Sequence, residues 1–379
     1  MNQPITFKTV AVLTLSGFLL AACEPAQEQE AVDPDPTETV TVPEPGEADT
    51  DTDTEETADE TDTLSQNMLD WLPMNEDTAY TYSGTGSEFA EYQSYPQFIH
   101  NDTLQFVETN ASTETVKIYE YTENEVREVF TRAETYFRDD FVDTGLNSSE
   151  QDQLEILLQA PVEIGRSWDS PSGSVSEITD ANVEVETPAG TYSALEITRT
   201  LNDQSDKLYY AKGTGLIQTI SDVDGETEII SSLSNIQEDA AEEIPLTLYE
   251  LNEMATALTT TNATMELRTN DPARLQLTEM LNGSTGDMTI PTLTENVQIN
   301  YLYLGNDQIA HVDFSEELIN DMNAGSGIEA LLIQSLVNTI GGLYQVDEVL
   351  LTVEDAPYAS GHIAMEEGQT MSVDLSSVE

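Results

Sequence analysis

The stretch Val116-Lys117-Ile118-Tyr119-Glu120-Tyr121 is a short run in which apolar or aromatic residues recur two positions apart, Val116 with Ile118 and Tyr119 with Tyr121. Successive side chains of a β-strand point to opposite faces, so this period is typical of a strand with one buried face. The same alternation recurs on both sides, in short runs separated by turn residues such as Asn101-Asp102, Pro188-Ala189-Gly190 and Asp224-Gly225. The segment from about residue 65 to 237 is therefore predicted to be an antiparallel β-rich domain. One helix is predicted within it, over Glu150 to Leu158.

A short acidic hinge, Gln237 to Glu243, is followed by a change of pattern. Asp271-Pro272 is typical of a helix start, with Asp271 as N-cap of a helix that runs to Leu281. Ser326-Gly327-Ile328-Glu329 has the form of a capping box, and it opens a second helix, to about Tyr344, with apolar residues at three- and four-residue spacing. Strands are expected over 244–251, 264–267, 297–304, 309–314 and 346–353. Together these elements predict a small α+β domain with two helices on a mainly antiparallel sheet.

Several features of this second domain, in order and spacing, resemble the GerMN domain of sporulation and spore-germination proteins. They are Leu275 to Leu281 followed by Gly283, Pro291, the run from Ala310 to Leu318, Gly325-Ser326-Gly327 before the helix with Leu336 to Ile340, and Val346 to Val353. The resemblance covers about residues 244 to 360, with 361–379 as a C-terminal tail. The chain departs from the family in having Glu354-Asp355-Ala356 where a glycine-bearing turn is usual. The resemblance implies no catalysis. The family's domain is similar to ring-building modules of secretion and sporulation channels, so the resemblance implies an assembly role.

The first domain has a weaker resemblance. Thr187 to Tyr192 followed by Tyr209 to Leu216, with Gly165 and Trp168 ahead of them, resembles a segment of uncharacterised bacterial envelope proteins. The resemblance implies an open or half-closed antiparallel barrel, similar to lipoprotein carriers. Such a half-barrel could hold a lipid or another apolar ligand. The alternative is that its aromatic residues fill a sheet core.

The N-terminus carries an apolar run from Val10 to Leu20 that ends in Leu20-Ala21-Ala22-Cys23, and Cys23 is the only cysteine. Residues 1–22 have the layout of a secretory signal. The four residues resemble the lipobox of bacterial lipoproteins, which implies cleavage before Cys23 and lipidation of its sulfur. An ordinary cleaved signal with a chance cysteine, or a free thiol, is the alternative. The lipoprotein interpretation predicts a protein held by acyl chains at the outer face of the cell membrane.

Acidic residues dominate the composition: 73 Asp and Glu stand against 11 Lys and Arg, a formal net charge of −62. Sixteen of these acids lie between Glu24 and Asp62, so residues 23–64 are predicted to form a disordered, self-repelling tether, and the other 57 belong to the rest of the chain. Such a charge repels nucleic acid. It indicates adaptation to high salt, or simply a soluble acidic protein.

Candidate chemistry is sparse. The alternating aspartates near Asp49 lack the glycine and glutamate of a calcium-binding loop. Of the histidines His100, His311 and His362, only His311 stands near a carboxylate in a strand, Asp313, and one such pair makes a poor metal or catalytic site. No catalytic, cofactor-binding or metal-binding residue is therefore predicted. The expected function is non-enzymatic protein–protein assembly in the envelope, in sporulation or germination, with envelope proteins or a second copy of the chain as partners; the alternative is lipid or apolar-ligand binding by the β-domain.

Overall fold

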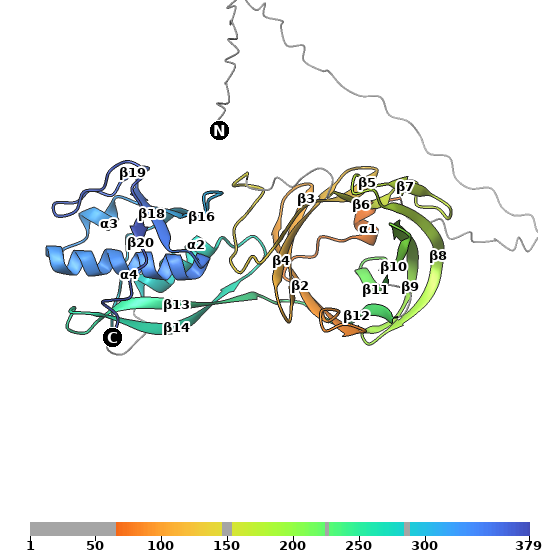
Figure 1. The fold of residues 1–379 in the computed structure, drawn as a ribbon, viewed down its shortest axis with the longest axis horizontal. Helices are drawn as coiled ribbons and strands as arrows, with labels where there is room; N and C mark the ends of the chain where they lie inside the picture. Colours follow the sequence, from red (N-terminus) through yellow and green to blue (C-terminus); the bar gives the residue numbers. More distant parts are fainter. Residues whose placement is uncertain (1–65, 146–153, 224–226, 284–288) are drawn as a thin grey trace, which may run out of the picture. The chain divides into compact units, whose positions relative to one another are not determined.

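A long antiparallel sheet forms the first part of the chain in this computed structural model (Figure 1), which describes residues 66–145, 154–223, 227–283 and 289–379. The strand order is β6-β5-β4-β3-β2-β1-β12-β11-β10-β9-β8-β7, so two meanders meet where β1 pairs with β12. Figure 1 shows this sheet curling into a nearly closed barrel. The expected half-barrel is thus confirmed. The strands are β1 (Ala79–Thr85), β2 (Tyr92–Ile99), β3 (Thr103–Asn110), β4 (Glu114–Tyr121), β5 (Glu125–Ala133), β6 (Glu155–Gln159), β7 (Ser167–Asp169), β8 (Val175–Thr187), β9 (Gly190–Leu201), β10 (Gln204–Ala211), β11 (Gly215–Val223) and β12 (Thr227–Gln237).

Among the described residues no strand ladder closes the barrel. Its two outer strands, β6 and β7, are instead joined by hydrogen bonds that involve side chains. The Trp168 indole N–H donates to the Ile156 carbonyl (2.8 Å), and the Ile156 N–H donates to the Ser170 hydroxyl (2.9 Å). Inside the barrel, the short helix α1 (Met68–Trp71) packs Met68 and Trp71 against apolar residues of the sheet. The helix therefore fills part of the interior.

The helix predicted over Glu150 to Leu158 is wrong in its described part. Residues 154–158 lead into and form most of strand β6, which pairs with β5 from Glu128 to Glu125. Leu158 is fully buried in the barrel core. Pairing with a long neighbouring strand outweighs the helical preference of Glu, Gln and Leu in so short a segment.

The second part of the chain is the predicted α+β domain, and its core is one continuous apolar cluster. Strands β13 (Glu242–Asn252), β14 (Leu258–Leu267) and β15 (Thr289–Ile290) form one sheet, in the order β14-β13-β15. A second sheet contains β16 (Ile299–Leu304), β17 (Ala310–Phe314), β18 (Glu348–Val353), β19 (Ala356–Pro357) and β20 (Met371–Ser372). The helices are α2 (Ala273–Asn282), α3 (Glu317–Asn320) and α4 (Ser326–Tyr344). The pairing is antiparallel except between β17 and β18, which are parallel and joined through α3 and α4.

Both predicted helix caps differ in the structure. Pro272 rather than Asp271 occupies the N-cap of α2, and the Asp271 carboxylate accepts the Arg268 N–H instead (2.9 Å). At α4 the N-cap is Gly325, with no side-chain cap. Glu329 is buried and accepts hydrogen bonds from the hydroxyls of Tyr358 (3.0 Å) and Ser360 rather than closing a capping box. A buried hydroxyl pair competes successfully for the carboxylate that a solvent-exposed helix start would use.

The turn that lacks the family's glycine is nevertheless tight. Glu354 and Asp355 both adopt positive φ, 50° and 62°, between β18 and β19. The Asp355 N–H donates to the Asp313 carboxylate (2.8 Å). This bond holds a left-handed turn that glycine would adopt without help.

The segment 361–379 is tied to the domain by strand pairing. β20 pairs with β18, and Val378 forms a parallel bridge with Leu258 at the start of β14. Val373 also packs against the domain core.

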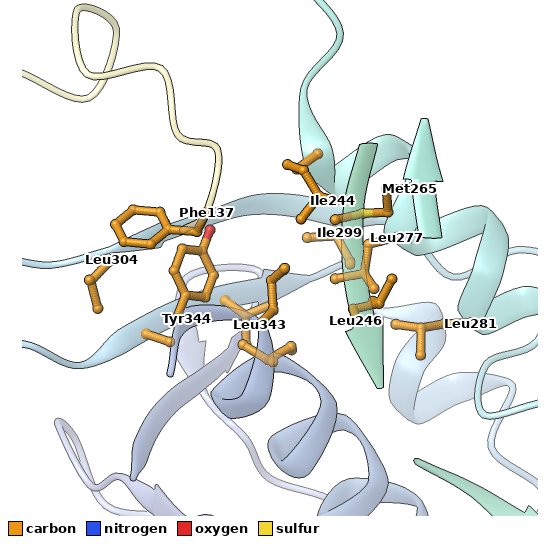
Figure 2. Packing of buried hydrophobic residues seen from close by; sticks show 14 of the residues in the cluster. Phe137, Ile244, Leu246, Met265, Leu277, Leu281, Ile299, Leu304, Leu343 and Tyr344 are labelled. Atoms are coloured by element: carbon orange, nitrogen blue, oxygen red, sulfur yellow. The ribbon is translucent and has the colours of Figure 1, made fainter. Parts of the chain in front are cut away.

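A buried group of polar residues joins the segment after β5 to the α+β domain. Arg138 donates to the Glu242 carboxylate (2.7 Å) and to the carbonyls of Gln97 and Arg268 (2.7 and 2.6 Å). Next to it, Asp139 accepts the Leu304 N–H (2.8 Å) and the Tyr344 hydroxyl (2.7 Å). Figure 2 shows Phe137 beside Leu304 and Tyr344 at this junction.

Candidate functional site

The barrel contains a partly open cavity of about 100 Å³, and eight of its eighteen lining residues are Tyr or Phe. Its wall comes from β1 to β4, β10 and β11, with Leu72 and Pro73 after α1 at one side. Two ring pairs are packed within this wall: Tyr82 stacks on Tyr92 with centroids 4.4 Å apart, and Phe106 meets Tyr119 edge-on at 4.7 Å. The lining residues are Leu72, Pro73, Asn75, Tyr80, Tyr82, Tyr92, Ser94, Tyr95, Pro96, Leu104, Phe106, Glu108, Tyr119, Tyr121, Tyr210, Thr214, Gly215 and Leu216.

Three of the strands that carry these rings, β1, β4 and β10, pair with a neighbouring strand that is bulged. The register shifts at Thr81/Tyr82, at Ile118/Tyr119 and at Tyr209/Tyr210. In each pair the extra residue lies on the partner strand, as Ser234 of β12, Val129 of β5 and Ile217 of β11. Alternation is therefore kept along β4: Tyr119 and Tyr121, two residues apart, share a face and both line the cavity.

The hydroxyl of Tyr121 has no hydrogen-bond partner among the described residues, although the side chain is more than nine-tenths buried. Tyr82, by contrast, donates its hydroxyl to the Leu216 carbonyl (2.8 Å). Burial raises the pKa of Tyr121, and it raises that of Tyr210 to about 12, so both phenols remain protonated. A buried hydroxyl without a partner costs about 1–3 kcal/mol, so Tyr121 is an open position for a polar ligand atom.

A charged group adjoins the cavity. Glu108 lines it and pairs with Lys117 (2.8 Å), whose ammonium is also 4.0 Å from Glu128. Burial works against the charge on Lys117, but the two carboxylates outweigh it and raise its pKa. Burial also raises the pKa of Glu128. The carboxylates of Glu108 and Glu128 thus both lie within 4.0 Å of the one ammonium group of Lys117, beside the aromatic wall.

The predicted His311 and Asp313 do not form a joint site. His311 contacts Asp307 (3.2 Å) and stacks on Tyr303, with the centroids 5.0 Å apart. Asp313 is buried and accepts the Thr352 hydroxyl (2.6 Å) as well as the Asp355 N–H. Across the described residues no group of three or more His, Cys, Asp or Glu side chains is arranged to hold a metal ion.

The predictions for the N-terminus lie outside the described residues. They are the signal over 1–22, the lipidation site Cys23 and the tether over 23–64. No helix in the part of the chain that the structure describes is both long and apolar enough to cross a membrane.

The second candidate site is the outer edge of β14. This strand pairs with β13 without a register shift, so its residues alternate in the direction of their backbone N–H and C=O groups. At Leu258 the N–H donates to the Ser377 carbonyl (2.8 Å) and the carbonyl accepts the Glu379 N–H (3.0 Å), so these groups point away from β13. Thr260, Asn262 and Thr264 have the same parity and are exposed. Among the described residues no strand pairs with this part of the edge.

Neither site was predicted in this form. The aromatic residues were expected as one of two things, a sheet core or a ligand-binding face, and the curling of the sheet that leaves a cavity between them has no clear signal in the sequence. The edge of β14 could have been suspected from Thr259 to Met265, a run of β-branched and other uncharged residues without proline or lysine. Natural edge strands usually carry proline or charged residues, lysine above all, which prevent pairing with other chains.

Comparison with known families bears on the second part of the chain. Residues 247–359 match the Germane family model, described as "Sporulation and spore germination", so the C-terminal region carries a Germane domain. This confirms the resemblance seen in the sequence. No curated protein matches the chain significantly.

Solved structures with a similar part include the tandem GerMN domains of the sporulation protein GerM from Bacillus subtilis, at 16% identity and a TM-score of 0.26 over 33% of this chain. The match spans 45% of the length of that structure. A candidate lipoprotein from Parabacteroides distasonis matches at 12% identity and a TM-score of 0.27, over 44% of this chain and 97% of that one. An exported protein with a YmcC-like fold from Bacteroides fragilis matches at 11% identity and 0.26, over 44% and 99%.

Proposed function

We propose that this protein is a non-enzymatic envelope lipoprotein that assembles with a partner protein through its Germane domain, in sporulation or spore germination. The family description supports the biological process. The Leu20-Ala21-Ala22-Cys23 sequence supports a lipid anchor at Cys23 and a location at the outer face of the membrane.

The observation that carries the proposal is the open edge of β14. Its first residue, Leu258, already pairs with the chain's own C-terminal residues in a single parallel bridge to Val378. The next outward-facing residues, Thr260, Asn262 and Thr264, offer the same donors and acceptors to another strand. Strand addition to an exposed edge is a common way to bind an extended segment, and its main-chain hydrogen bonds supply the affinity.

The barrel cavity gives less support to lipid binding. Its volume of about 100 Å³ is below the roughly 300–1,000 Å³ of typical ligand pockets. Helix α1 fills part of the interior, and Glu108 places a charge at the wall. An acyl chain would need a longer and less polar cavity.

The experiment is a pair of substitutions at one edge residue. Asn262→Pro removes the outward N–H of residue 262, whereas Asn262→Ala removes the side chain and keeps that N–H. Proline is tolerated at a sheet edge when its nitrogen faces outward, so both variants should fold. The readout is site-specific cross-linking from Thr260 in cells, together with the oligomeric state of the purified protein.

We expect Asn262→Pro to abolish a defined cross-linked product and Asn262→Ala to keep it. If that product contains two copies of this chain, the partner is the chain itself; if it contains another envelope protein, that protein is the partner. A product that survives in Asn262→Pro would refute docking at this edge.

A further inference from the structure

We propose that the aromatic cavity of the barrel binds the head group of a choline-type cation, a small quaternary ammonium ion that carries a hydroxyl. This site is separate from the edge of β14 and does not depend on the function proposed for it.

The wall has the composition that such cations require. Tyr82, Tyr92, Phe106, Tyr119, Tyr121 and Tyr210 line one small cavity. Aromatic faces attract an ammonium ion through the negative potential above the ring, and aromatic cages are the common way to hold quaternary ammonium groups. The attraction increases where water is excluded, as it is around the buried Tyr82 and Tyr210.

Charge favours a cation over an anion or a neutral ligand. Glu108 lines the cavity, and Lys117 must be shared between Glu108 and Glu128, which leaves an excess of carboxylate there. The chain as a whole carries a net charge of −62, which concentrates cations around it.

Size and polarity restrict the ligand further. A volume of about 100 Å³ is too small for an acyl chain, so only a compact head group could enter the cavity. The unpartnered Tyr121 hydroxyl is a hydrogen-bonding group that a plain alkylammonium ion would not use. A ligand hydroxyl next to the ammonium group would satisfy it.

Calorimetric titration of the full-length chain tests this with two probes of the same shape. Choline and 3,3-dimethyl-1-butanol differ in having nitrogen or carbon at the branched centre, so only the charge changes. We expect choline to bind at least roughly tenfold more tightly, which corresponds to about 1.4 kcal/mol of cation–π and carboxylate attraction. Equal affinity of the two probes, or no binding of choline, would overturn the proposal.

Two variants at one ion pair give opposite predictions. Glu108→Gln removes the carboxylate at the wall and should weaken choline binding several-fold, with the neutral probe unaffected. Lys117→Met removes the competing ammonium and should tighten it. The same direction of change in both variants would contradict the proposed role of Glu108.

Free choline and the head group of a choline lipid share this chemistry. The two sources are distinguished by titrating the chain with choline in phosphatidylglycerol vesicles, with and without added phosphatidylcholine. Suppression of choline binding by phosphatidylcholine assigns the site to a lipid head group, and unchanged binding assigns it to the free solute. Absence of choline binding in both vesicle types refutes the site.

Discussion

Asp139 should make the protein less stable as the pH rises from about 4 to about 7. The carboxyl group is buried between the barrel and the Germane domain, where it contacts the Leu304 N–H and the Tyr344 hydroxyl. Burial raises its pKa from the ordinary 3.8 to about 7, although these two hydrogen bonds and the charge of Arg132 act in the opposite direction; the neighbouring Asp140 raises it further.

The direction in which the free energy of unfolding changes with pH depends on which state, folded or unfolded, holds the Asp139 proton. Between pH 4 and 7 the folded protein keeps the Asp139 proton, while the unfolded chain has released it. The folded state then binds more protons, so the free energy of unfolding falls as the pH rises. Each pH unit is worth 1.36 kcal/mol, so the loss between pH 4 and 8 is about 4 kcal/mol.

Asp139→Asn imitates the protonated acid, because its oxygen can accept from Leu304 while its NH₂ donates to the Tyr344 oxygen. We expect the variant to match the wild type at pH 4 and to exceed its stability by about 4 kcal/mol at pH 8. The assay is urea unfolding at several pH values and constant salt. Comparing the two proteins cancels the titration of the other carboxylates.

Asp143→Asn serves as the control, since Asp143 is exposed in the same loop and should leave the pH profile unchanged. A stability difference between Asp139→Asn and wild type that does not change with pH would show that the buried carboxyl is not protonated in the folded state. An Asp139→Asn variant that is less stable than wild type at pH 8 would refute the reasoning as well.

Further predictions concern the anchor, the helix packing, the barrel seam and salt. Cys23→Ser should move the protein from the membrane to the soluble fraction and stop incorporation of labelled fatty acid, and retention at the membrane would contradict the anchor. Gly341→Ala should cost about 1–3 kcal/mol in urea unfolding, because the added carbon would lie 2.3 Å from Val373, whereas Gly342→Ala meets no atom within 4 Å and should be tolerated. Trp168→Phe should destabilise the barrel by a similar amount, since it leaves a carbonyl of β6 unpaired; an unchanged unfolding midpoint would contradict this seam. The thermal midpoint should rise steeply with KCl, because salt screens the acidic surface, and a flat response would contradict the salt-adaptation hypothesis.

Much of the fold could be predicted, because burial of one face produces a period of two in strands and of about 3.6 in helices. The alternation from Val116 to Tyr121 is strand β4, and the apolar spacing after Ser326 is helix α4. The predictions that failed depended on contacts with distant residues. Glu329 bonds to Tyr358 rather than to its own helix start, and the segment before Leu158 pairs with β5.

The candidate sites were harder to predict for the same reason. Alternation puts Tyr119 and Tyr121 on one face of β4, but whether that face lines a cavity depends on how strands far apart in the sequence curl around it. The open edge of β14 depends on how far the C-terminal residues extend along it, and they pair only at Leu258 in the described structure. The local sequence pattern therefore predicts the strands, whereas pairing between segments far apart in the chain determines where the candidate sites lie.

The distribution of charge connects the two proposals. Several of the few basic residues in the described part of the chain form ion pairs within the fold: Arg138 is buried against Glu242, Lys117 pairs with Glu108, and Arg199 pairs with Asp206. A protein partner that approaches this chain therefore meets a negative field that its own carboxylates would increase. The run from Leu258 to Met265 carries no charged residue, so main-chain pairing there avoids that repulsion. The same field draws small cations towards the barrel, where aromatic rings and an excess carboxylate can hold one after its water is removed.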